Sequence, residues 1–135
     1  MAITQKRKVA RIYKDIDMAF TKNSLSGDIN KKLDVNAVKQ SIKTLLLGKP
    51  FERPFHPELG SNLWNSLFEN MRPGMEMGLQ RQIGQQLNEY EPRADLLSIK
   101  ANPDYDNNGY DVTIRFIVVG INEPQELTLS LSRLR

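Results

Sequence analysis

The fold is decided at residues 87–97, which read LNEYEPRADLL. Before this stretch, apolar residues recur every three or four positions, and after it they alternate as they do in a strand. Pro92 pushes the residue before it out of the helical conformation, so the helix must end there. The sequence therefore predicts a corner between a helix and a strand, with Glu91 and Arg93 on either side of Pro92.

Three helices are predicted from apolar positions that repeat at helical spacing. Asp34 and Ser61 stand before two of them and are residue types that cap helix N-termini. Gly48, followed by Pro50, is expected to end the first helix. The first predicted helix follows Asp34 and is closed by Gly48, the second follows Ser61 and reaches Met71, and the third runs from about Met75 to Tyr90.

Strands are predicted at both ends of the chain. Residues 11–20 read as a short edge strand, and three strands follow the corner, separated by polar turns at 102–109 and 120–125. In the last strand the leucines face inward and the small polar residues outward: Leu127, Leu129 and Leu131 against Thr128, Ser130 and Ser132. The predicted fold class is α+β, with three helices packed on one face of a small antiparallel sheet, a C-terminal β-meander and an N-terminal edge strand.

Length and composition predict one domain, residues 11–135, preceded by a flexible basic arm at 1–10. The net charge is +3, and no stretch interleaves aromatic and basic residues, so no nucleic-acid partner is expected. No apolar run is long enough to span a bilayer, so no membrane association is expected. The chain has no cysteine, which excludes disulfides and thiolate chemistry and suits synthesis in the cytoplasm.

Catalytic chemistry is not expected. His56 is the only histidine and there is no cysteine, so no metal ligand set, cofactor site or nucleophilic triad is predicted. Glu58, Glu69 and Glu91 are the remaining candidates for a glycosidase pair, which needs one carboxyl group with a raised pKa. A pairing of Glu91 with Arg93 would lower the carboxylate pKa instead. The chain is therefore predicted not to be an enzyme.

Residues 48–60 hold three prolines and are expected to form an ordered loop with Phe51 and Phe55 tucked beneath it. Within this loop, a spaced set of residues resembles a loop of the baseplate wedge subunit, or sheath initiator, of contractile-tailed phages. The set consists of Arg53, Pro54, Phe55, Pro57 and Gly60. The string at 13–17 and the Glu-Pro-Arg corner are similar to the same family, which is related to TssE of type VI secretion.

The resemblance implies a structural part of the tail baseplate, assembled in the host cytoplasm as one of several copies in a sixfold hetero-oligomer in the virion. It implies that Glu91, Pro92 and Arg93 contact the helical core bundle formed by other wedge proteins. It also implies that the last strand, including Arg133, adds a strand from the tail sheath protein. Phage tail, tailocin and secretion system fit the resemblance equally.

Two alternatives remain open from the sequence. The first is a non-catalytic cytoplasmic adaptor or regulator on the same fold, which binds one protein partner. The second is a lysozyme-like peptidoglycan hydrolase, whose activity would depend on Glu58, Glu69 or Glu91. The bland interpretation of the corner itself is a helix end with two solvated charged side chains.

Overall fold

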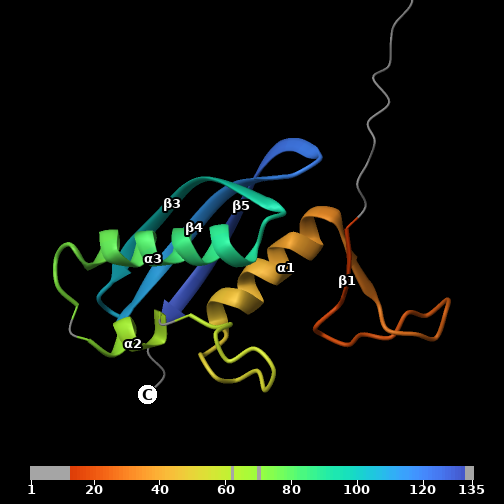
Figure 1. The fold of residues 1–135 in the computed structure, drawn as a ribbon, viewed down its shortest axis with the longest axis horizontal. Helices are drawn as coiled ribbons and strands as arrows, with labels where there is room; N and C mark the ends of the chain where they lie inside the picture. Colours follow the sequence, from red (N-terminus) through yellow and green to blue (C-terminus); the bar gives the residue numbers. More distant parts are fainter. Residues whose placement is uncertain (1–12, 62, 70, 133–135) are drawn as a thin grey trace, which may run out of the picture.

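Two long helices, one short helix and two antiparallel sheets make up the described part of the chain, residues 13–61, 63–69 and 71–132 of a computed structural model (Figure 1). The N-terminal elements are β1 (Lys14–Ile16), β2 (Lys31–Leu33) and α1 (Asp34–Leu47). The middle of the chain forms α2 (Leu63–Phe68) and α3 (Met75–Tyr90). The C-terminal elements are β3 (Ala94–Asp104), β4 (Gly109–Val118) and β5 (Ile121–Ser132).

The larger sheet is an antiparallel meander in the order β3-β4-β5. Its central strand, β4, has the apolar residues of one face fully buried: Val112, Ile114, Phe116 and Val118. Ile114 pairs with Ile99 of β3 on one side and with Leu127 of β5 on the other. Because successive side chains of a strand point to opposite faces, this register places one continuous apolar face against the helices.

The core forms where α1 and α3 meet that apolar face (Figure 1). α3 lies along β3 and buries Leu79, Ile83 and Leu87, one residue per turn of the helix. α1 adds Ile42 and Leu46, which are fully buried in the same cluster. The core therefore fixes the C-terminal end of α3, where the corner begins.

The prediction of three helices on one face of one sheet is wrong. α2 is only six residues long and packs against α3. The N-terminal strand is not an edge of the meander, because β1 pairs with β2 in a separate two-stranded sheet that lies against α1. A strand of three residues is too short to show an alternating pattern, so the sequence does not predict β2.

Both predicted N-caps have other roles. The residue before α1 is Leu33, and Asp34 accepts a hydrogen bond from the backbone N–H of Tyr13 (3.2 Å). Ser61 is buried and donates its hydroxyl to the carbonyl of Leu46 (2.6 Å), which ties the start of α2 to the end of α1. The predicted arm at 1–10 lies outside the described residues.

None of the helices in the described ranges has the length and apolar character that a membrane crossing requires.

Candidate functional site

The corner, defined as Glu91, Pro92 and Arg93, lies where α3 ends and β3 begins. The backbone N–H of Glu91 donates to the carbonyl of Leu87 (2.9 Å), which closes the last turn of the helix. The carbonyl of Arg93 accepts the N–H of Val119 (2.9 Å), in the turn between β4 and β5. The residues on both sides of Pro92 are therefore held by backbone hydrogen bonds, while Pro92 itself is exposed.

Glu91 and Arg93 form a bidentate ion pair. Nε of Arg93 donates to Oε1 of Glu91 (2.8 Å), and Nη2 donates to Oε2 (3.1 Å). The hydroxyl of Ser41, on α1, also donates to Oε2. Glu91 is only 3% exposed, so its charge is buried and satisfied by groups of this same chain.

Arg93 extends the network to the N-terminal sheet. Its Nη1 donates to Oδ2 of Asp15 in β1 (3.2 Å), and its guanidinium carbon lies 5.6 Å from the ring centroid of Tyr13. The Tyr13 hydroxyl donates to the carbonyl of Val119 (3.0 Å). One set of polar contacts therefore joins β1, α1, the corner and the β4–β5 turn.

The pKa of Glu91 lies below its ordinary value because of these partners. Burial by itself acts to raise the pKa, but the hydrogen bonds from Arg93 and Ser41 and the positive charge of Arg93 outweigh burial. The pKa of Arg93 is raised, chiefly by its hydrogen bond to Glu91. The bland interpretation of two solvated side chains is wrong for Glu91, because the pair is internal.

The carboxylates considered for glycoside hydrolysis do not provide a general acid with a raised pKa. The pKa of Glu58 is lowered by its own backbone N–H and then by His56, whose Nδ1 lies 3.1 Å from Oε1. Glu69 is exposed on the segment after α2. Across residues 13–61, 63–69 and 71–132, no three His, Asp or Glu side chains are grouped closely enough to hold a metal ion.

β5 forms one edge of the meander and pairs only with β4 among the described strands. Leu129 and Leu131 are buried, and Leu127 is half-buried, which holds the strand to the core. Thr128 and Ser130 are exposed. Arg133, which the resemblance adds to this strand, lies outside the described residues.

The opposite edge, β3, is protected from further pairing. A register shift between Leu96 and Ser98 leaves Leu97 without a partner on β4. Pro103 has no backbone N–H with which to bind a further strand. β5 has neither device between Leu127 and Ser132, where its register with β4 is continuous. β5 has the same two devices near its start, where it contains Pro124 and its register with β4 shifts beside Val118, so the open part of this edge is residues 127–132.

Residues 48–61, here called the proline loop, contain the set Arg53, Pro54, Phe55, Pro57 and Gly60. The N–H of Ser61 donates to the carbonyl of Gly48 (3.0 Å), and the N–H of Phe51 donates to that of Pro57 (3.1 Å), so the loop is closed on itself. Gly60 has φ of 155°, and a Cβ there would lie 2.5 Å from the carbonyl of Lys49.

The expectation that Phe51 and Phe55 are tucked under the proline loop is wrong. Their exposed fractions are 82% and 91%. Phe51 also has φ of +68°, a left-handed conformation that is uncommon for a bulky residue. The hydrogen bonds that close the loop use its backbone, so the two aromatic rings are left to point outward.

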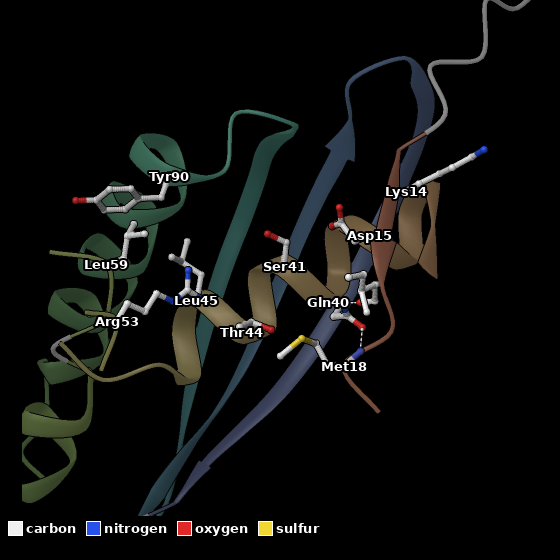
Figure 2. Close-up of a pocket in the computed structure, with 11 residues that line it drawn as sticks. Lys14, Asp15, Met18, Gln40, Ser41, Thr44, Leu45, Arg53, Leu59 and Tyr90 are labelled. Carbon is white, nitrogen blue, oxygen red and sulfur yellow. Dashed lines mark hydrogen bonds between the residues drawn. The ribbon is translucent and has the colours of Figure 1, made fainter. Parts of the chain in front are cut away.

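A groove of about 520 Å³ lies next to the corner, and we call it the α1 groove (Figure 2). It is lined by β1 and the residues that follow it, by the outer face of α1, by the proline loop and by Tyr90 at the end of α3. Asp15 and Ser41 line this groove and also hold Arg93 and Glu91. The groove and the corner are therefore contiguous.

Nothing in the sequence marks Ser41 as a partner of Glu91. Ser41 sits beside the apolar positions of an amphipathic helix, where a serine is usually solvated, and it is 50 positions from Glu91. Asp15 and Tyr13 are marked by the sequence, because they belong to the string at 13–17 that resembles the wedge-subunit family. That string marked the segment as noteworthy without indicating a contact with Arg93.

Comparison with known proteins gives consistent matches. The family model for baseplate wedge protein gp25 matches residues 33–123. The chain is 34% identical to baseplate wedge protein gp25 of Enterobacteria phage T4 over 111 residues, which is 82% of this chain and 83% of that protein.

Two solved structures share the fold. A putative tail lysozyme from Geobacter sulfurreducens has a TM-score of 0.66 and 21% identity, covering 73% of this chain and 89% of that chain. A chain of the anti-feeding prophage baseplate has a TM-score of 0.64 and 18% identity, covering 90% of this chain and 86% of that chain. At these identities the likeness establishes the fold alone.

Proposed function

The chain belongs to the family of baseplate wedge protein gp25, and from that premise we propose that it docks on the helical core bundle of the wedge and starts the tail sheath. Its role is structural, as a component of a contractile-tail baseplate. The observation that carries the proposal is the corner, which is rigid and presents an exposed proline beside a partly exposed arginine. The open edge of β5 supports the second half of the proposal.

Within the corner, the three residues have different parts in docking. Pro92 is exposed, and 25% of the Arg93 side chain is accessible, so these two offer the contact surface. Glu91 is buried and acts through Arg93, whose guanidinium it holds in one orientation. A side chain that is already ordered loses little entropy when it meets a partner helix.

Docking is tested by co-purifying the chain with the core-bundle proteins of the same wedge. We expect the wild type to join the complex and Pro92→Glu to be lost from it, because the new charge lies on the contact surface without breaking the ion pair. Pro73→Glu is the matched control, since Pro73 is exposed at the opposite end of α3. The proposal is contradicted if Pro92→Glu still co-purifies with the core-bundle proteins, or if the wild type does not bind them.

We propose that the first sheath ring adds a strand to β5. An open edge offers unpaired N–H and C=O groups, and its side chains set the register of the added strand. A soluble protein with an unprotected edge risks unwanted pairing unless another chain covers it. The continuous register of residues 127–132 supports this assignment over β3.

The variant Thr128→Lys/Ser130→Lys tests strand addition, because lysines on an edge strand oppose pairing. We expect baseplates to assemble normally and sheath rings to be missing when particles are counted by electron microscopy. Asn102→Lys on β3 is the control and should leave sheath assembly intact. Sheaths on particles that carry the double variant would exclude β5 as the starting strand.

We propose that the protein is not an enzyme. The lowered pKa values of Glu58 and Glu91 support this, because the carboxyl group that acts as general acid in a glycosidase has a raised pKa. The purified chain should release no soluble fragments from peptidoglycan above the background given by Glu58→Gln and Glu91→Gln. Release that disappears in either variant would restore the hydrolase alternative.

A further inference from the structure

The α1 groove has a wall that is built by specific hydrogen bonds. The side chain of Gln40, on α1, donates to the carbonyl of Ile16 (2.8 Å) and accepts the N–H of Met18 (3.2 Å). These two bonds hold the chain after β1 beside α1, as the dashed lines in Figure 2 show. Met18 is 55% exposed at the rim, so the wall presents an apolar side chain that the core does not use.

The floor of the groove is largely apolar. Leu45 of α1, Leu59 of the proline loop and Tyr90 of α3 line it together with Thr44 (Figure 2). Leu59 and Tyr90 pack against the edge of the core, so this floor is supported from below. A groove between packed elements with an apolar floor is the usual site for the apolar face of a helix.

Arg53 is the unusual member of the lining. The proline loop carries it to the groove, where its side chain lies beside Leu45 and Leu59 (Figure 2). Within residues 13–61, 63–69 and 71–132, its guanidinium has no hydrogen bond or ion pair. Asp15, the acidic residue of the lining, is engaged with Arg93. Lys14 also lines the groove, and its amino group points outward in Figure 2.

The groove therefore combines an apolar floor with the positive charges of Arg53 and Lys14, neither of which is paired with an acidic side chain of the described residues. Arginine binds carboxylates through two parallel N–H donors, and such a pair gains strength where water is excluded. Asp15 and Ser41 belong to both the groove and the corner network, so the two surfaces adjoin and one partner can contact both.

We propose that the α1 groove receives an amphipathic helix of another wedge protein, with its apolar face on Leu45, Leu59 and Met18 and a carboxylate on Arg53. This inference rests on the proposed function and assigns to it a second contact and the chemistry of the partner. A second copy of this chain is a different occupant, which the test distinguishes.

The test compares two charge reversals in the full chain, Arg53→Glu and Lys43→Glu. Lys43 is an exposed lysine of α1 that does not line the groove, so both variants change the net charge equally. In co-purification with the core-bundle proteins, we expect Arg53→Glu to weaken binding at least tenfold and Lys43→Glu to bind like the wild type. The binding of Arg53→Gln should be weaker than that of Lys43→Glu and stronger than that of Arg53→Glu. The urea midpoint of each free variant should match the wild type, because the guanidinium of Arg53 makes no hydrogen bond or ion pair with the described residues.

A photo-crosslinking residue in place of Met18 identifies the occupant in the assembled wedge. We expect a crosslinked peptide that is amphipathic and contains Asp or Glu, and replacing that acid with Arg should restore the binding of Arg53→Glu. Crosslinks to a second copy of this chain, or to a peptide without an acid, would overturn the inference. Arg53→Glu binding as the wild type does would overturn it while leaving the docking proposal intact. A wild type that joins no complex would reject both.

Discussion

The corner and the proline loop use similar residues in opposite ways. Both are fixed by prolines, and both carry an arginine near a glutamate in the sequence. At the corner the charges point inward, where Arg93 and Glu91 satisfy each other. In the proline loop the backbone is satisfied internally, while two phenylalanines and the charge of Arg53 face outward. Residue type therefore does not reveal which side chains hold the fold together and which ones are free to meet a partner; the internal pairing does.

This difference has a measurable consequence. Substitution of Glu91 should cost folding stability, because it leaves the charge of Arg93 without its partner. Substitution of the outward residues of the loop should leave stability unchanged, because nothing in the fold depends on them. A substitution that disturbs the backbone of the proline loop, in contrast, should lower folding stability about as much as a substitution of the ion pair at the corner.

Glu91→Ala should have the largest effect, lowering the free energy of unfolding by about 2–3 kcal/mol, because Arg93 and Ser41 lose their shared acceptor. Urea denaturation measures the change. Glu89→Ala is the matched control, since Glu89 is exposed two residues earlier and should shift stability by less than about 0.5 kcal/mol. Equal losses in the two variants would place the pair on the surface.

Gly60→Ala should cost about 2 kcal/mol, because the new Cβ meets the backbone of Lys49 and Pro50 at a φ that alanine rarely adopts. Gly78→Ala, in α3 with no atom within 4 Å of the new Cβ, should instead gain up to about 1 kcal/mol. Thermal unfolding of the two variants gives the comparison. If Gly60→Ala were neutral, the loop would not be closed as described.

Acid should remove the stability that the corner contributes. The pKa of Glu91 is lower in the folded protein than in the unfolded chain, so unfolding takes up a proton at acid pH. The contribution is complete above the ordinary value of 4.5 and is lost as the pH falls through the lowered pKa. The urea midpoint of the wild type should therefore fall more steeply below pH 4.5 than that of Glu91→Gln. Parallel curves would exclude the ion pair as the cause.

The smallest effect is expected at the exposed aromatics. Phe55→Ser should change the free energy of unfolding by less than about 0.5 kcal/mol, whereas a buried phenylalanine would cost roughly 3–5 kcal/mol on truncation. Phe51→Asn should be neutral as well, because asparagine tolerates the left-handed conformation there. A loss above about 1 kcal/mol in either variant would show that the ring packs against the protein.

The long elements could be predicted from the sequence because each carries a strong local signal. The residues of α1 and α3 repeat at helical spacing, Pro92 marks the end of α3, and β4 and β5 alternate over many residues. The α2 helix was expected to be longer, and β2 was missed, because short elements are set by their neighbours more than by their own pattern.

The site was less predictable, for physical reasons. That Glu91 and Arg93 pair follows from their closeness in sequence, but Ser41 and Asp15 reach them only through the tertiary fold. The outward rings of Phe51 and Phe55 contradict the general rule that large apolar residues are buried. That rule fails where a segment is shaped by its backbone hydrogen bonds.

The sequence separations within the corner network bear on the order in which the protein folds. Tyr13 and Val119 are 106 positions apart, and Asp15 and Arg93 are 78 apart, whereas the strands of the meander follow one another through short turns. Closing a long loop lowers the entropy of the chain before the contacts at its ends can stabilise the fold, so contacts between distant residues form slowly. We expect the meander and α3 to form first and the network to close last. Glu91→Ala should then accelerate unfolding in stopped-flow measurements while leaving the refolding rate nearly unchanged.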